Sequence, residues 1–476
     1  MKSLLNKKIS LGLTTALAAV MPITLTNLTS CSQSNSIQFA NYESYMNDRL
    51  MNHLSSEYGV QFQYFTVAEM IETKFERFYD ICVPPGYELV SLYTKGLLHK
   101  IDWAKFDIKD SKGNKITNST QARGLFVTGG DIFNDMNDNF RAYLKKMGDP
   151  QADSFDVLDY GIPYFAQQFM FGYKGEKLDF YKYNTTNKTE DPTWLDIFYT
   201  ISPANPNCDS RFKKASRTNY CSMLDDAKTM YDIARIMETI NDPSGPTNVI
   251  PEGSTVDSMI ETLSTLTDMF KGDQWFVLNT DSGIISRNFA NRVHSNPCVF
   301  SWSGDMLYAA LGAEEFNPYS AAEMHIQKPS VASLDEIEFL VINKKDEKDS
   351  SKLNEIYNIV KEVCLDGCDL TPDANGIAKT DADGNYVHWS MANWDTVNYT
   401  PMLQNIYQYT IGSEEYWSDY LDKLGLEGQV RQDTLKLYQS IITPTVEEVK
   451  SIYGKTLTPL QNSDTHWAWM QAKQKL

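Results

Sequence analysis

The sequence predicts a two-lobed α/β fold, and three observations support this fold class. From Ile37 onward, short apolar strands alternate with helices of about ten to fifteen residues, the pattern of βαβ units around a parallel sheet. A second series of the same kind begins near residue 160. The chain has 476 residues, a length greater than a single hydrophobic core usually supports, and 42% of them are hydrophobic. We therefore expect two lobes, each a mixed sheet flanked by helices, with a hinge between them.

The first series predicts strands and helices in alternation. The predicted strands are 36–41 (SIQFAN), 60–67 (VQFQYFTV) and 79–84 (YDICVP). Helices are predicted at 44–59, through Met70 and Phe75, and from Tyr87.

The second series opens with the apolar stretch YGIPYFAQQFMFGYKG at 160–175. A helix is predicted at 222–238, with Ser222 as N-cap and Asp225 three residues later, which would place Asp226 in the first turn. The strand 337–343 should precede a helix at 351–366 that ends at Gly367.

The N-terminus has the layout of a secretory signal peptide, residues 1–30. Three lysines precede an uncharged apolar run from Ile9 to Leu28. The run ends in LTSC at 28–31, which resembles a bacterial lipobox; this resemblance implies cleavage before Cys31, its acylation (palmitate) and a tether at 31–36. The alternative is a simple membrane helix, since the run is just long enough to span a bilayer. We expect a body held at the outer face of the cell membrane.

Charge excludes some partners. The net charge is −19, and loss of the three signal-peptide lysines makes it −22. Such a surface repels nucleic acid and attracts cations, although acidity can also serve solubility alone. We expect no nucleic-acid partner.

Metal and disulfide frameworks are not indicated. Six cysteines follow Cys31, with no CxxC pair, so disulfides and free thiols both stay open for Cys208, Cys221, Cys364 and Cys368. The Asp/Gly-rich loop 366–386 suggests a calcium loop, but Ala382 stands where the twelfth position needs an acid. We expect no metal.

Motifs of the common catalytic classes are absent. The sequence contains no HExxH, GxGxxG, Walker loop or GxSxG elbow. A catalytic group assembled only in three dimensions would escape this search. We expect a binding protein without a cofactor rather than an enzyme.

Five segments in the same order carry a family resemblance. They are ANYESYMNDRLMNHLSSEYGVQFQYFT, YDICVPPGYELVSLYTKGLLHKID, YGIPYFAQQFMFGY, LDDAKTMYDIA and SWSGDMLYA. Together they resemble the spermidine/putrescine-binding proteins of bacterial ABC importers, which have the type II periplasmic-binding-protein fold. The resemblance implies lobe 1 at 37–162 plus 338–400 and lobe 2 at 163–337 plus 401–476.

The resemblance also implies the ligand-binding residues. Two residues depart from the family pattern: Pro85 stands at a small polar position and Thr229 at an acidic one. A shift of two residues in the match to the family pattern would exchange Glu336 and Glu338. The implied aromatic residues are Tyr42, Tyr45, Tyr87, Trp302 and Tyr399, and the implied acids are Glu43, Asp226, Asp305, Glu336 and Glu338.

These residue types suit an organic cation. Removing an ammonium group from water requires a carboxylate partner, and aromatic faces add cation–π attraction of about 0.5–2 kcal/mol each. We expect a monomeric, lipid-anchored binding protein that delivers a polyamine, putrescine or spermidine, to an ABC permease. Two alternatives stay open: a binder of another cation or a metal chelate, and a surface interaction lipoprotein that has lost its cleft and uses the insertions 115–158 and 366–392.

Overall fold

The computed structural model describes residues 36–65, 71–127, 131–212, 221–271, 276–293, 296–444 and 449–476. The predicted signal peptide, Cys31 and nearly all of the tether lie outside these residues. Within them, the helices are too short or too polar to cross a bilayer.

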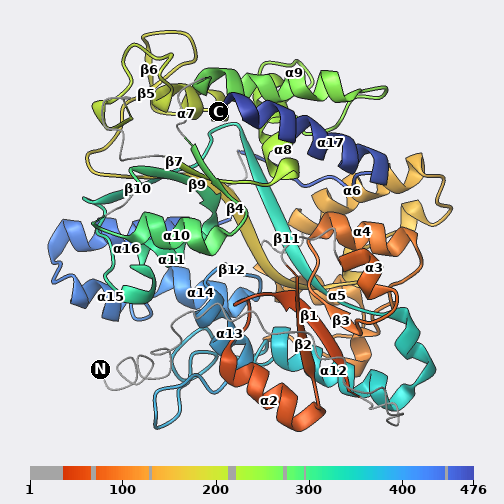
Figure 1. Ribbon diagram of the computed structural model, residues 1–476. Coiled ribbons are helices and arrows are strands. Elements are labelled where there is room, and N and C mark those ends of the chain that lie inside the picture. Colours follow the sequence, from red (N-terminus) through yellow and green to blue (C-terminus); the bar gives the residue numbers. More distant parts are fainter. Residues whose placement is uncertain are drawn as a thin grey trace, which may run out of the picture.

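One large mixed sheet runs through the molecule (Figure 1), in the order β2-β1-β3-β11-β4-β9-β7-β8. Strands β10 and β12 pair with β4, and β13 pairs with β11. The strands are β1 (Gln38–Tyr42), β2 (Gln61–Phe65), β3 (Ile81–Cys82), β4 (Ile162–Lys174), β7 (Cys221–Leu224), β8 (Phe276–Asn279), β9 (Cys298–Trp302), β10 (Met324–Gln327), β11 (Ala332–Ile342), β12 (Thr400–Pro401) and β13 (Lys450–Tyr453), and a separate hairpin joins β5 (Phe180–Tyr181) to β6 (Lys188–Thr189).

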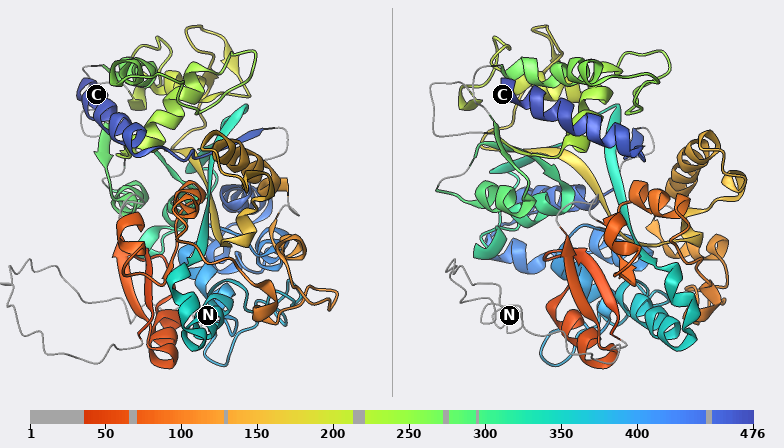
Figure 2. Two further views of the ribbon diagram at one scale, coloured as in Figure 1. Left: turned by 90° about the vertical axis from the view of Figure 1, so that its right-hand side faces the viewer. Right: turned by 45° about the vertical axis from the view of Figure 1, so that its right-hand side comes forward.

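The two long central strands connect two lobes, as predicted. Strands β1, β2 and β3 are parallel and lie on one side, and β7, β8 and β9 are parallel and lie on the other. Strands β4 and β11 are antiparallel and pass from one group to the other (Figure 2). Their register shifts between Ile337 and Phe339, in the middle of β11. This irregularity lies at Glu338, one of the predicted acids.

Helices cover each lobe. In the first lobe, α2 begins at the N-cap Asn47 and ends at Gly59, whose φ of 65° suits glycine. The helices packed in this lobe are α2 (Asp48–Tyr58), α3 (Ile71–Phe75), α4 (Gly86–Thr94), α12 (Ser350–Cys364) and α13 (Trp389–Val397). The prediction of a helix at 351–366 is therefore confirmed to within two residues.

In the second lobe, α17 packs against α8 and α9. The predicted start of the helix at Ser222 is wrong: residues 221–224 form β7, and Asp226 itself is the N-cap of α8, accepting from the Thr229 amide at 2.7 Å. The helices here are α7 (Trp194–Ile201), α8 (Ala227–Glu238), α9 (Val256–Thr267), α10 (Ser282–Ala290), α11 (Ser303–Ala310) and α17 (Pro459–Ala472); the others are α5 (Ser119–Ala122), α6 (Asp131–Lys146), α14 (Gln404–Gly412), α15 (Ser418–Lys423) and α16 (Gly428–Ile442).

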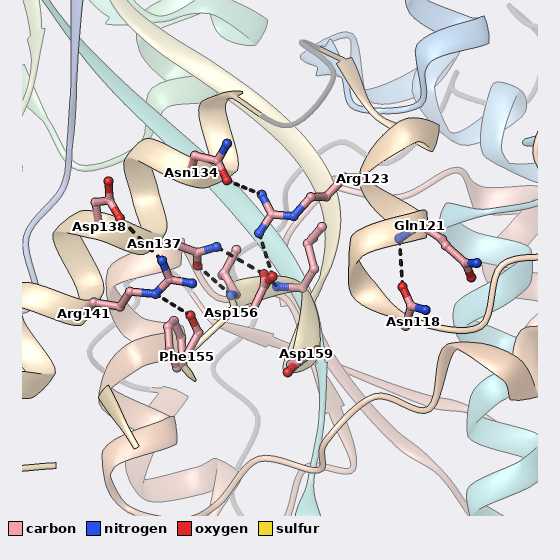
Figure 3. A network of polar contacts seen from close by, with 12 residues as sticks. Asn118, Gln121, Arg123, Asn134, Asn137, Asp138, Arg141, Phe155, Asp156 and Asp159 are labelled. Atoms are coloured by element: carbon pink, nitrogen blue, oxygen red, sulfur yellow. Dashed lines mark hydrogen bonds and ion pairs between the residues drawn. The ribbon is translucent and has the colours of Figure 1, made fainter. Parts of the chain in front are cut away.

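The segment predicted as an insertion at 115–158 contains a well-connected polar network (Figure 3). Arg123 Nη2 donates to Asp156 Oδ2 at 2.6 Å, and Arg123 Nη1 donates to Asn134 Oδ1 at 2.9 Å. Asp156 also accepts from Asn137 Nδ2 at 3.2 Å and from the Leu158 amide at 3.1 Å. The ion pair joins Arg123 to the loop that precedes β4, and the hydrogen bonds of Asn134 and Asn137 connect α6 to this pair.

The cysteines of the described body are free thiols in the interior. Cys208, Cys221, Cys364 and Cys368 are all buried and form no disulfide bond, and the same is true of Cys82 and Cys298.

Candidate functional site

The candidate site is built around two acids in the middle of β11, Glu336 and Glu338. Both are buried, with 7% and 3% of their surfaces exposed. They lie where β11 passes between the lobes, and each belongs to a different set of neighbours. We call these sets the Glu338 centre (Glu338, Asp305, Tyr45, Tyr399) and the Lys228 centre (Lys228, Asp232, Glu336, Tyr87).

In the Glu338 centre, the carboxyl group of Glu338 accepts hydrogen bonds from two segments. The Tyr45 hydroxyl donates to Oε2, and Gln167 Nε2 donates to Oε1 at 3.3 Å. Burial raises the pKa of Glu338 to about 8, the Tyr45 hydrogen bond opposes this shift, and Glu336 and Asp305 add to it. Without a cation nearby, Glu338 holds its proton at neutral pH.

Asp305 is the second acid of the Glu338 centre. It lies in the first turn of α11, directly after β9, and accepts from Ser301 Oγ at 3.4 Å. Burial raises the pKa of Asp305 to about 6, while hydrogen bonds from Ser282, Tyr399 and Ser301 oppose the shift.

Aromatic rings border the same centre. The Tyr45 and Tyr399 rings lie 5.2 Å apart, edge to face, and Tyr42 lies 5.6 Å from Tyr45. Trp302 is half-buried and packs its ring edge to face against Phe169 at 5.3 Å. Aromatic side chains therefore gather beside the carboxyl groups, and Tyr45 and Tyr399 contact them through their hydroxyl groups. Aromatic rings beside carboxyl groups suit a dehydrated organic cation.

The stretch SWSGD at 301–305 has a local explanation. Strand β9 ends at Trp302 and α11 begins at Ser303. Ser303 Oγ accepts a hydrogen bond from the Gln168 amide of β4 at 3.2 Å. A Cβ at Gly304 would overlap the Tyr399 ring. Glycine at 304 thus lets Tyr399 reach Asp305.

Within the described ranges, neither carboxyl group of the Glu338 centre forms an ion pair with lysine, arginine or histidine. The charged groups that act on Glu338 are the carboxyl groups of Glu336 and Asp305. One buried and one half-buried acid therefore share a site whose neighbours are acids, hydroxyls and rings.

In the Lys228 centre, a lysine of the chain lies among the acids. Lys228 Nζ is 2.9 Å from Asp232 Oδ2 and 4.2 Å from the centre of the Tyr87 ring. Burial lowers the pKa of Lys228, but Asp232, Glu336 and Asp226 outweigh it, so the pKa is raised. Burial raises the pKa of Glu336 to about 8 against the pull of Lys228.

The ten predicted binding residues thus divide between two centres, with one outside both. Tyr42, Tyr45, Asp305, Glu338 and Tyr399 gather at the Glu338 centre, and Trp302 lies beside it as the N-cap residue of α11, whose first turn carries Asp305. Tyr87, Asp226 and Glu336 lie around Lys228. Glu43 is exposed at the end of β1 and lies outside both centres.

Sequence reasoning missed Lys228, Gln167 and Tyr164. The Tyr164 hydroxyl donates to the Tyr45 carbonyl at 2.6 Å and so fixes the loop after β1. The available signal for Lys228 was its i, i+4 spacing to Asp232 on one helix face.

Among the described residues, no cluster of three or more His, Cys, Asp or Glu side chains is arranged to hold a metal ion.

Comparison with protein-family models identifies the family of the chain. A family model described as hypothetical lipoprotein (MG045 family) matches residues 5–466. The chain belongs to this lipoprotein family. The comparison with curated proteins gave no match.

Solved structures are similar to this MG045-family lipoprotein to different degrees. A protein assigned to spermidine/putrescine ABC transport in Listeria monocytogenes superposes with a TM-score of 0.52 and 14% identity, over 92% of this chain and 99% of that one. The substrate-binding protein PotD of Streptococcus pneumoniae gives 0.48 and 14%, over 93% and 99%. Thiaminase I of Bacillus thiaminolyticus gives 0.48 and 12%, over 92% and 99%. The Listeria structure confirms the predicted two-lobed substrate-binding-protein fold.

Proposed function

We propose that this lipoprotein is the solute-binding component of an ABC importer and that it captures a small organic amine at the Glu338 centre. The observation that supports this is a pair of carboxyl groups, buried Glu338 and half-buried Asp305, bordered by aromatic side chains and lacking a basic partner among the described residues. Buried acids cost free energy unless a cation or a proton compensates them. An ammonium group would supply that compensation.

The polyamines predicted from the sequence are the first ligands to test. One ammonium would lie between Glu338 and Asp305, and the rings of Tyr42, Tyr45 and Trp302 would contact the methylenes and the charge. Because residues from both lobes contribute, ligand contacts would favour the closed form, which is presented to the permease.

Anchoring and lobe boundaries belong to the same proposal. Membership of a lipoprotein family supports acylation at Cys31 and a place at the outer face of the membrane. The monomeric state predicted from the sequence stays part of the proposal. We retain the lobes as 37–162 plus 338–400 and 163–337 plus 401–476.

Calorimetry with two variants tests the site. Trp302→Ala and Asp305→Ala should each weaken amine binding at least tenfold, about 1.4 kcal/mol. The controls are Trp467→Ala, an exposed tryptophan on α17, and Asp153→Ala, whose side chain is 84% exposed. Unchanged affinity in both site variants would refute the assignment.

Proton release on ligand binding provides an independent test of the site. Because Glu338 holds a proton up to a pKa of about 8, binding of a cation at pH 7 should release it. Affinity should therefore rise with pH between 6 and 8, and the measured enthalpy should depend on the ionisation enthalpy of the buffer.

A thermal-shift panel separates the ligand classes. Putrescine, spermidine, thiamine and ferric chelates test the amine against the other cation and chelate binders. Stabilisation by none of them would favour a surface interaction lipoprotein.

A further inference from the structure

Lys228 occupies a position suited to an ammonium group. It is the second residue of α8, and its side chain is only 8% exposed. Its Nζ pairs with Asp232 at 2.9 Å and lies 4.2 Å from the centre of the Tyr87 ring. A lysine on the first turn of a helix is ordinarily solvated, and its charge is unfavourable there. The acids around it compensate for both costs.

The C-terminal segment encloses this ammonium. A Cβ at Gly454 would overlap Glu336 Oε1 and lie 2.7 Å from Lys228 Nζ and 2.8 Å from Tyr87 Cδ1. Thr456 Oγ1 donates to the Tyr87 carbonyl at 2.9 Å, which fixes the segment over the ring. Glycine at 454 therefore leaves room for the lysine, the acid and the ring to meet.

The neighbours of Lys228 are residues predicted to bind the ligand. Tyr87, Asp226 and Glu336 were expected to receive an ammonium group, and all three act on Lys228 instead. The Glu338 centre has no such internal cation among the described residues. Each centre offers acids and rings, but only the Lys228 centre already holds a cation of the chain.

We propose that Lys228 takes the place of a ligand's second ammonium group, so that the site selects amines with a single positive charge over diamines. This inference rests on the proposed amine-binding function. Glu336 acts electrostatically on Glu338 and is itself acted on by Lys228, so the two centres adjoin along β11. An amine held at the Glu338 centre would therefore direct its other end toward Lys228. An apolar or neutral end is tolerated there, whereas a second ammonium would meet a like charge in a partly dehydrated environment.

Wild-type protein tests the inference without any mutation. n-Butylamine and putrescine have the same four-carbon stem and differ by one ammonium group. We expect n-butylamine to bind at least tenfold more tightly in calorimetry at pH 8. Putrescine binding tenfold more tightly than n-butylamine, or equally well, would overturn the inference and leave the proposed function standing. Failure of both amines and of every other organic cation would reject the proposed function itself.

Substitution of Lys228 should reverse the selectivity. Lys228→Met frees Asp232, Glu336 and Asp226 for a second ammonium, so the affinity for putrescine relative to n-butylamine should rise at least tenfold. Lys228→Arg keeps the charge and should keep the wild-type preference. An unchanged ratio in a folded Lys228→Met variant would overturn the inference.

Two further variants serve as a control and as a replacement in case Lys228→Met does not fold. Lys473→Met removes another lysine–aspartate pair of this lobe, Lys473 with Asp225 at 2.8 Å, and should leave the ratio unchanged. If Lys228→Met unfolds, Lys228→Met with Asp232→Asn removes both charges of the pair and leaves Glu336 and Asp226 to receive the ammonium. This double variant should show the same reversal, and retention of the wild-type preference would overturn the inference.

Discussion

Glu338→Gln should produce a protein that is more stable at alkaline pH than the wild type and that no longer binds its ligand. Burial raises the pKa of Glu338 from 4.5 to about 8 in the folded state. Between these values the unfolded chain has lost the proton while the folded chain retains it, so folding becomes less favourable as pH rises. Each pH unit costs about 1.4 kcal/mol.

The size of the effect follows from this interval. The wild type should lose about 3 kcal/mol of stability through Glu338 alone between pH 5 and pH 8. Glutamine is neutral at both pH values, has a similar shape and can still accept the Tyr45 hydrogen bond. The variant should therefore gain about 3 kcal/mol over the wild type at pH 8 relative to the difference at pH 5.

Urea unfolding at pH 5 and pH 8 measures this difference. Glu355→Gln is the control, because Glu355 is exposed on α12 and should show no gain that depends on pH. A variant that is less stable than the wild type at pH 8, or that retains wild-type amine affinity, would contradict the electrostatic account of the Glu338 centre.

Two other substitutions test the packing around the site. Gly304→Ala would place a methyl group in the Tyr399 ring, so we expect a loss of about 1–3 kcal/mol in urea unfolding and weaker amine binding, whereas Gly412→Ala, where nothing lies within 4 Å, should leave binding unchanged. Equal binding by both glycine variants would show that Tyr399 does not depend on residue 304. Asp156→Asn should cost about 2–3 kcal/mol because it leaves the Arg123 guanidinium, whose side chain is 14% exposed, without its charge partner. The control is Asp153→Asn, which removes a solvated ion pair with Lys145 and should change stability far less. Similar losses of stability in the Asp156 and Asp153 variants would refute a structural role for the Figure 3 network.

Much of the architecture could be predicted because local patterns and tertiary packing agree there. The alternating strands and helices of the first series form β1, α2, β2 and α4 close to their predicted positions. The helix at 222 shows where local reasoning fails. Ser222 and Asp225 have the spacing of a capping pair, but residues 221–224 gain more by pairing with β8 and β9, so the helix starts after Asp226.

The residue types of the site could also be predicted, but their partners could not. Tyr45 and Glu338 are 293 residues apart, and no spacing rule connects them. Lys228 was missed because a lysine next to two aspartates at a helix start reads as an exposed residue.

The sequence by itself determined the alternation of elements, the two-lobed α/β fold and the supply of acids and aromatic residues in order along the chain. Periodicity and turn chemistry are local properties, so they can be read directly. Only the tertiary structure decided that Glu336 faces a lysine and Glu338 does not. The charge state of a buried acid depends on every group within several ångströms, and these groups come from segments that only folding brings together.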